Sequence, residues 1–431
     1  MQFKQYPSYK PSGVEWLGDV PEHWDSCNLK FISKIYAGGT PDRNRLDYWV
    51  KGEIPWINSG AVNQVIIKEP SEYITELGLK NSSAKYIPVN SLVMALAGQG
   101  KTKGMVAYTS IETTCNQSMA AIVPKNYHYK FLYYWLDSNY QNIRNLTGGD
   151  NRDGLNLAVL SNIPCPKISI VEQTQIASFL DYETFRIDNL IAKQEKLIEL
   201  LEEQRKSIIS HAVTKGLNPN APMKDSGVEW LGDVPEHWNL KKFCYLFDEN
   251  KKKNIGLQET NVLSLSYGNI KEKNIDDNKG LLPESFETYQ IIKPNDIVFR
   301  FTDLQNDKRS LRSAISKYHG IITSAYIAVK TKQNADFYNY LFRAYDLQKV
   351  FYSMGEGMRQ SLKMDELNKM PVVLPSEDEQ KRIVSFLDSE TSRIDNLIAK
   401  QEKLIEKLKE YRSSIISHAV TGKIDIRELV A

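Results

Sequence analysis

The sequence predicts an α+β protein, in which two globular mixed α/β domains are separated by two long, pseudo-symmetric antiparallel helices that resemble a coiled coil. Three observations predict this fold: an identical short repeat, a longer near-identical repeat with helical spacing, and two unlike blocks that precede the long repeats. The 431 residues are enough for several domains with their own cores. The hydrophobic content of 41% is ordinary for a globular protein.

A short element is present twice without any change. Residues Ser12–Trp24 read SGVEWLGDVPEHW, and residues Ser226–Trp238 repeat them. Repetition of whole segments is the signature of a duplicated architecture. We therefore expect the chain to run through a short element, a globular block and a helix, and then through the same sequence of elements again.

The longer repeat has the features of a helix. Residues Glu172–Thr214 and Glu379–Thr421 match at 34 of 43 positions, and neither contains Gly or Pro. Each is preceded by the pattern Ser-x-x-Glu, which is typical of a capping box at a helix start. Each is followed by a glycine, Gly216 or Gly422, suited to a left-handed C-terminal cap.

Apolar residues recur at heptad spacing along both repeats, with Gln194 as a polar residue in the series. Such a stripe needs a partner, and the simplest partner is the other copy, packed antiparallel. The alternative is that each helix packs on its own domain. The expected helix-pair interface consists of Ile187, Leu190, Ile191, Leu197, Ile198, Leu201, Ile208, Ile394, Leu397, Ile398, Leu404, Ile405, Leu408 and Ile415.

The repeats divide the chain into seven segments. Two of them, 25–168 and 239–375, are the globular blocks, and they share almost no continuous identity. Two short segments of the first block nevertheless resemble segments of the second and indicate one shared fold. IPVNSLVM, at 87–94, resembles IKPNDIVF, at 292–299, and QSMAAIV, at 117–123, resembles SAYIAV, at 324–329. The other segments are an N-terminal stretch of residues 1–24, helix 169–216, linker 217–238, helix 376–422 and tail 423–431.

Composition limits the class of protein. The formal net charge is +2, which neither indicates nor excludes a nucleic-acid partner, because phosphate contacts need only a local basic surface. The four cysteines, Cys27, Cys115, Cys165 and Cys244, have no metal-binding spacing and are expected to be free thiols. No apolar stretch is long enough for a membrane span or signal core, so we expect a cytoplasmic protein.

No catalytic motif is complete. ALAGQGKT, at 95–102, lacks the first glycine of a phosphate-binding loop, and the residues that follow it favour a strand rather than a helix. Neither NPPY nor DPPY occurs, and no histidine has a second ligand at metal-binding spacing. The histidines within the repeats are expected to be structural, as are His211 and His418 near the helix ends.

Basic and polar side chains in the expected loops are the candidate nucleic-acid contacts, because Arg and Lys can bind guanine and Asn and Gln can bind adenine. Each residue alone is typical of a solvated surface, and the set gains its meaning from the duplication. Lys101 and Lys103 are the expected backbone contacts, and Arg309 and Arg312 the expected readers in the second block. The full set is Gly39, Thr40, Arg43, Asn58, Ser59, Gln99, Lys101, Thr102, Lys103, Arg152, Arg300, Lys308, Arg309, Arg312 and Arg359.

Over nearly its whole length the sequence resembles the specificity subunits of type I restriction–modification systems. The resemblance is carried by the two GVEWLGDVPEHW elements, GGTP at 38–41, IPWINSG at 54–60 and the EQ…I…FLD…RID helix starts. GGTP and IPWINSG are absent from the second block, so contact residues there cannot be carried over from these motifs.

The resemblance implies a non-catalytic DNA-binding subunit whose two target-recognition domains each read half of a bipartite double-stranded target. It also implies two methyltransferase subunits docked on the helices, and restriction subunits that join them. S-adenosylmethionine, ATP and Mg²⁺ would then belong to those partners, with no cofactor or metal in this chain. Two other interpretations stay open: a coiled-coil adaptor presenting two unlike protein-binding domains, and an enzyme that hydrolyses a nucleotide at the Gln99–Thr102 loop.

Overall fold

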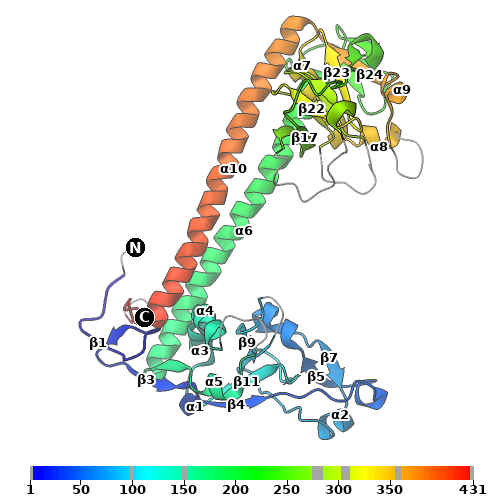
Figure 1. Ribbon diagram of the computed structural model, residues 1–431. Helices are drawn as coiled ribbons and strands as arrows, with labels where there is room; N and C mark the ends of the chain where they lie inside the picture. Colours follow the sequence, from blue (N-terminus) through cyan, green and yellow to red (C-terminus); the bar gives the residue numbers. More distant parts are fainter. Residues whose placement is uncertain are drawn as a thin grey trace. The chain divides into compact units, whose positions relative to one another are not determined.

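The computed structural model describes residues 3–97, 101–147, 154–273, 285–301, 311–354 and 361–427. The chain forms two compact units. Unit 1 comprises Met1–Lys193 with Lys403–Ala431, and unit 2 comprises Gln194–Glu402. Each contains one globular α/β region and a half of each long helix (Figure 1). The predicted fold class, two mixed α/β regions and two long helices, is confirmed.

A five-stranded sheet forms the centre of unit 1, in the order β4-β11-β8-β9-β6. Its first four strands pair antiparallel, and β6 pairs parallel with β9. A three-stranded sheet, β10-β5-β7, belongs to the same unit. The bounds are β4 Ser33–Ala37, β5 Ile54–Ile57, β6 Ile66–Ile67, β7 Glu72–Ile74, β8 Leu92–Ala95, β9 Val106–Thr109, β10 Thr114–Cys115 and β11 Met119–Pro124.

Unit 2 has a four-stranded antiparallel sheet in the order β16-β23-β20-β21. This repeats the order β4-β11-β8-β9 of unit 1, and the similar segments of the two blocks supply β11 and β8 in unit 1 and β23 and β20 in unit 2. The similar segments therefore predicted a shared fold correctly. The bounds are β16 Phe247–Glu249, β20 Ile297–Phe299, β21 Ser313–Ile315, β23 Ile327–Thr331, with β17 Leu263–Ser266, β18 Asn269–Glu272, β19 Gln290–Ile292 and β22 Gly320–Ile322 in two further antiparallel pairs.

Short strands and helices complete each unit in the same way. The repeated element contributes to the strand pairs β1–β2 and β13–β14, and a second pair, β3–β12 or β15–β24, follows it. The bounds are β1 Tyr9–Pro11, β2 Asp19–Pro21, β3 Asp25–Asn28, β12 Pro164–Lys167, β13 Met223–Asp225, β14 Asp233–Pro235, β15 Asn239–Lys242 and β24 Pro371–Leu374. The helices are α1 Leu29–Ile32, α2 Glu76–Lys80, α3 Tyr129–Ser138, α4 Tyr140–Asn145, α5 Leu157–Ser161, α7 Ala335–Leu347, α8 Val350–Met354 and α9 Met364–Leu367.

The two long helices are α6, Ile170–Lys215, and α10, Glu377–Val420. The serine half of the predicted capping box is present at both starts, because the Ser169 hydroxyl accepts from the Glu172 N–H at 3.2 Å and the Ser376 hydroxyl accepts from the Glu379 N–H at 3.3 Å. Their ends are also as predicted, since Gly216 and Gly422 have φ of +77° and +70°.

The helix seam follows a strict alternation of four and three residues. In α6 the less exposed positions include Ile187, Ile191, Gln194, Ile198 and Leu201, and α10 repeats them 207 positions later. The prediction that Leu197 and Leu404 lie in this interface is wrong, because they are 40% and 41% exposed. Each precedes a seam isoleucine, and adjacent residues on a helix point about 100° apart, so these leucines lie at the rim.

The halves of α6 and α10 pack antiparallel within each unit. In unit 1, Ile187 shares a buried core with Ile415 and Ala419. In unit 2, Ile209 and Ala212 share one with Ile383 and Leu387. These cores also include residues of the globular regions, so each helix packs on its own domain as well as on its copy. Among the residues that the structure describes, no helix combines the length and apolarity needed to cross a membrane.

Candidate nucleic-acid interface

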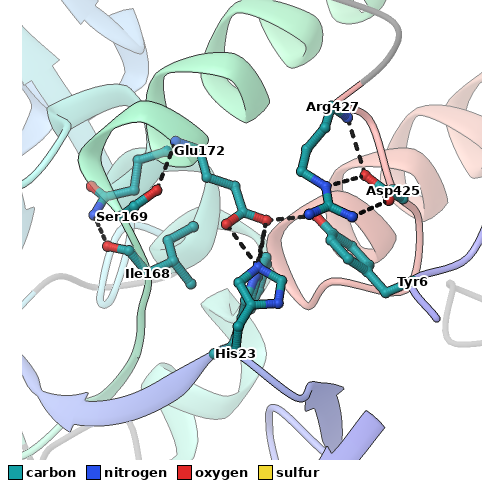
Figure 2. A network of polar contacts seen from close by, with 9 residues as sticks. Tyr6, His23, Ile168, Ser169, Glu172, Asp425 and Arg427 are labelled. Carbon is teal, nitrogen blue, oxygen red and sulfur yellow. Dashed lines mark hydrogen bonds and ion pairs between the residues drawn. The ribbon is translucent and has the colours of Figure 1, made fainter. Parts of the chain in front are cut away.

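The first repeated element is held between the start of α6 and the end of α10 in unit 1 (Figure 2). The buried Glu172 carboxylate accepts hydrogen bonds from the Tyr6 hydroxyl at 2.7 Å and from Trp24 Nε1 at 3.1 Å. His23 Nε2 lies 3.0 Å from the same carboxylate, consistent with its predicted structural role. This carboxylate therefore does not complete a reciprocal capping box, because it contacts side chains of the repeated element instead.

The end of α10 completes this attachment. Lys423 Nζ donates to the Asp19 carbonyl, and the Tyr9 hydroxyl donates to the Gly422 carbonyl. A Cβ added at Gly422 would lie 2.4 Å from Pro21 Cδ, so glycine is needed here for close approach as well as for its positive φ.

The second copy of the element is held in the same manner in unit 2. His237 Nε2 lies 3.0 Å from the Glu379 carboxylate at the start of α10. Lys215 Nζ, at the end of α6, donates to the Leu231 and Asp233 carbonyls. The identical sequence of the two elements is explained by this environment, since both copies bind one helix start and one helix end.

The GGTP motif is mainly structural. Gly39 is buried, and its carbonyl accepts from Trp56 Nε1 at 3.0 Å. A Cβ there would lie 2.3 Å from Ser83 Oγ, and one at Gly38 would lie 2.0 Å from the Cys115 carbonyl oxygen. The prediction that Gly39 contacts DNA is therefore wrong in this conformation, because its backbone is enclosed by the loop packed against it.

Thr40, within this motif, and Arg43, just after it, are on the surface. Thr40 Oγ1 donates to Gln117 Oε1. Arg43 stacks 3.7 Å from the centre of the Trp49 ring and forms two hydrogen bonds to Glu72, at 2.6 and 2.9 Å. The Arg43 guanidinium is therefore fixed in place, with about half of its side chain exposed.

The IPWINSG motif forms β5 and the turn that follows it. Asn58 caps the short helix Ser59–Gln64, since its Oδ1 accepts from the Gly60 N–H at 2.9 Å. Asn58 and Ser59 are both partly exposed. Asn58 thus has a clear structural role, and its role in base contact stays a prediction.

The basic loop before β9 contains one exposed and one buried lysine. Lys101 is exposed, Thr102 is partly exposed, and the Lys101 carbonyl accepts from the Tyr140 hydroxyl. Lys103 is only 3% exposed, so its predicted contact with a DNA backbone is wrong in this conformation. The segment continues into strand β9, which agrees with the prediction that no helix start faces a phosphate here.

In unit 2, Arg300 is partly exposed and donates its backbone N–H to the Arg312 carbonyl at 2.8 Å. Arg312 is completely buried, and its N–H binds Asp346 at 2.9 Å. Arg312 is therefore a core residue rather than the reader that the sequence suggested. Five predicted contacts, Gln99, Arg152, Lys308, Arg309 and Arg359, lie outside the described residues.

A cationic group on the edge strand β4 was not predicted from the sequence. Lys34 Nζ lies 5.6 Å, and Lys85 Nζ 5.9 Å, from the centre of the Tyr36 ring. Both lysines are exposed, and basic residues around an aromatic ring are a typical candidate for nucleic-acid contact. Lys34 and Tyr36 share a face by strand alternation, which the sequence could have indicated, but Lys85 comes from a distant loop.

Within the described ranges, no cluster of three His, Cys, Asp or Glu residues is placed to hold a metal ion. Cys27 and Cys165 are free and face each other as partners in the β3–β12 pair. Burial raises the pKa of both thiols, so neither has the lowered pKa of an activated nucleophile.

A sequence profile for the type I restriction modification DNA specificity domain matches residues 21–203 and 314–410, which together make up more than half of the chain. The chain belongs to this type I specificity family. The fold duplication, the repeated elements and the unlike loops described above are therefore features of a type I specificity subunit.

Known relatives of this specificity subunit agree with the assignment. The chain is 30% identical over 206 residues to the EcoR124I/EcoR124II specificity subunit of Escherichia coli, an alignment that spans 48% of that protein. It is 22% identical to the MjaIX specificity subunit of Methanocaldococcus jannaschii, over 96% of both chains.

Two solved structures share the fold. A chain from work on complex assembly and conformational transition of the type I R-M system has a TM-score of 0.69 at 14% identity. That match covers 94% of this chain and 99% of the other. The HsdS subunit from Thermoanaerobacter tengcongensis has a TM-score of 0.56 at 14% identity, with 94% and 98% covered. At this identity the likeness concerns the fold alone.

Proposed function

We propose that this specificity subunit is a non-catalytic DNA reader, in which each globular region reads one half of a bipartite target and the helices set the spacer between the halves. The observation that supports it is the contrast between constant and variable segments. Both copies of the repeated element bind helix ends alike, whereas the loops of the two blocks are unlike. A protein with two different DNA-reading domains on one duplicated scaffold would need both constant attachment sites and variable loops.

The same proposal assigns the chemistry to partners. Two methyltransferase subunits dock on α6 and α10, and restriction subunits join them on double-stranded DNA. S-adenosylmethionine, ATP and Mg²⁺ are bound by those subunits. The incomplete phosphate-binding loop and the absence of an NPPY-type motif in the sequence support this division of labour.

The test is to map methylated adenines in the host genome with and without this gene, using the intact methyltransferase gene in both strains. We expect one bipartite motif to lose its methylation when the gene is absent. As a control for catalysis, rigorously purified chain should methylate no DNA. If the chain binds methyltransferase but no DNA motif depends on it, the adaptor interpretation replaces this proposal.

A further inference from the structure

The start of α6 in unit 1 is covered by the N-terminal segment of the chain. The Tyr6 hydroxyl donates to the Glu172 carboxylate at 2.7 Å, and the Tyr6 ring lies 5.6 Å from the ring of His23 (Figure 2). Phe3 packs edge-on against Phe179, with their ring centres 5.7 Å apart, and Phe179 is only 8% exposed. The segment thus places two aromatic side chains, three residues apart, on this helix start.

The start of α10 in unit 2 has a pocket at the matching place. Its volume is about 460 Å³, and it is lined by Leu217, Asn218, His237, Ser376, Glu379 and Arg382. Each lining residue has a counterpart in unit 1 through the sequence repeats. Three of these counterparts, His23, Glu172 and Asp425, lie beside Tyr6 in Figure 2. The pocket therefore corresponds to the space that the Tyr6 side chain occupies in unit 1.

The linker of unit 2 does not supply the two aromatic rings. The residues that stand in the sequence where Phe3 and Tyr6 stand in the first copy are Leu217 and Asn220, and both are exposed. Phe386, the counterpart of Phe179, is accordingly 39% exposed. The same helix face is thus covered in unit 1 and open in unit 2.

The carboxylate in this pocket has room for another donor. In unit 1, Glu172 accepts from both Tyr6 and Trp24. In unit 2, Glu379 pairs with His237 at 3.0 Å, but Trp238 Nε1 donates to no acceptor among the described residues. Because a carboxylate can accept about four hydrogen bonds, Glu379 can still accept one from a hydroxyl group.

We infer that this pocket of unit 2 binds a tyrosine side chain carried by a segment of a methyltransferase subunit. Unit 1 gives the pattern for this occupant, since Tyr6 and Phe3 cover the equivalent groups there. The hydroxyl of the bound tyrosine donates to Glu379, and an apolar side chain of the same segment covers Phe386. The inference rests on the proposed docking of methyltransferase subunits on α6 and α10.

The source of the tyrosine follows from the number of segments. The chain has one N-terminal segment, and its Tyr6 and Phe3 are already bound in unit 1. A second copy that placed its segment in unit 2 would uncover its own helix start, so the exchange would gain no contact. DNA is disfavoured because Glu379 repels phosphate. A different polypeptide is therefore required, and the pocket lies on a helix where methyltransferase subunits are proposed to dock.

The repeat supplies a matched pair of positions for a crosslinking test. A photoreactive benzophenone amino acid replaces either Arg382, which is exposed at the pocket, or its counterpart Gln175, which is partly exposed in unit 1. The full chain is irradiated in complex with its methyltransferase subunit, and crosslinked peptides are identified by mass spectrometry. We expect position 382 to crosslink to a tyrosine-containing segment of the methyltransferase, and position 175 to the chain's own residues 3–6.

A matched pair of substitutions tests the acceptor. Glu379→Gln should weaken the binding of one methyltransferase subunit by about tenfold, because a hydrogen bond to a charged acceptor is lost. Glu172→Gln, checked for a cooperative thermal transition, should leave that affinity unchanged, since Tyr6 fills the equivalent site. Replacing the crosslinked tyrosine of the partner by phenylalanine should weaken binding as Glu379→Gln does, and the two changes together should have no larger effect. Native mass spectrometry measures stoichiometry and affinity.

Several results would overturn the inference. One is an assembled complex in which position 382 crosslinks to DNA, to a second copy of the chain, to a methyltransferase segment without tyrosine, or to nothing. Another is an affinity for both methyltransferase subunits that Glu379→Gln leaves unchanged. A wild-type chain that binds no methyltransferase subunit would instead overturn the proposed function.

Discussion

Arg412 in α10 binds Asp188 in α6 through two hydrogen bonds, from Nε to Oδ1 at 2.8 Å and from Nη2 to Oδ2 at 3.2 Å. In unit 2, Arg205 and Asp395 form the equivalent pair, with the helices exchanged. Corresponding residues of the two pairs are 207 positions apart in the sequence, so the duplication produced two interhelix ion pairs from one. Each arginine occupies a seam position that an apolar residue would otherwise fill.

The first prediction concerns this pair. Arg412→Ala should lower the free energy of unfolding by about 1 kcal/mol, because both partners are partly exposed and the pair is bidentate. Urea denaturation of Arg412→Ala, Asp188→Ala and the double variant measures the coupling. Arg205→Ala is the matched comparison, and we expect a smaller effect since its contact to Asp395 is longer. Additive single effects in the cycle would contradict a direct interaction.

The second prediction concerns Asp336, the counterpart of Lys130. Lys130 forms an ion pair with Asp181, whereas Asp336 faces Asp388, and burial together with that like charge raises the pKa of Asp336. A carboxyl whose pKa is raised on folding favours the folded state below the unfolded pKa of 3.8 and loses that contribution as pH rises through the folded value.

Asp336→Lys should therefore stabilise the protein at pH 7, by up to about 1 kcal/mol, through a new pair with Asp388. The gain should shrink as the pH falls toward about 3, because carboxylates in general become protonated in this range and lose the charge on which the new pair depends. Thermal melts across this range measure it. Lys130→Asp is the reciprocal variant and should destabilise at neutral pH. Equal gains from Asp336→Lys at about pH 7 and about pH 3 would show that charge is not the cause.

The third prediction separates the two lysines of the loop before β9. Lys101→Ala should weaken binding to all DNA sequences and lower the slope of log affinity against log salt by about one, because one phosphate contact is lost. Lys103→Ala is the control, since the buried Lys103 side chain is expected to leave the slope unchanged. Filter binding of the assembled complex over a range of salt concentrations measures both. An unchanged slope in Lys101→Ala would make this loop an ordinary solvated turn.

The fourth prediction concerns modularity. Replacing residues 25–168 with those of a relative should change one half of the methylated target and leave the other intact, because the helices and repeated elements are shared. Sequencing of methylated adenines in cells carrying the chimera reads both halves at once. A change in both halves would contradict independent reading, provided that the chimera still assembles with its methyltransferase.

The fifth prediction tests whether the helices set the spacer. Seven helix-forming residues are inserted after Lys196 in α6 and, at the repeated position, after Lys403 in α10. A full heptad adds about 10.5 Å and keeps the phase of the seam. At about 3.4 Å per base pair, the unread spacer should lengthen by about three base pairs while the half-sites stay the same. An active variant with an unaltered spacer would show that the helices do not set this distance.

Much of the duplicated architecture was predictable from the sequence. The duplication, the ends of α6 and α10 and most of the seam follow from local signals: residue identity, a cap, a terminal glycine and heptad spacing. The equivalence of strands in the two sheets also followed from short similar segments such as IPVNS and IKPND. Asn90 and Asn295 in these segments both adopt positive φ. Such patterns can be recognised in a sequence because a helix or strand repeats its buried face at a fixed interval.

Only the tertiary structure decided what individual loop residues do. Gly39 is enclosed by Ser83 and Cys115, and Arg312 is buried beside Asp346, contacts made by residues far apart in the sequence. The same is true of Arg343, because its electrostatic interaction with Arg205 depends on packing between residues far apart in the sequence. Burial of a loop side chain depends on what packs over it, and no local periodicity records that. The sequence by itself thus determined the duplicated architecture, and tertiary packing decided which loop side chains are buried and which are exposed.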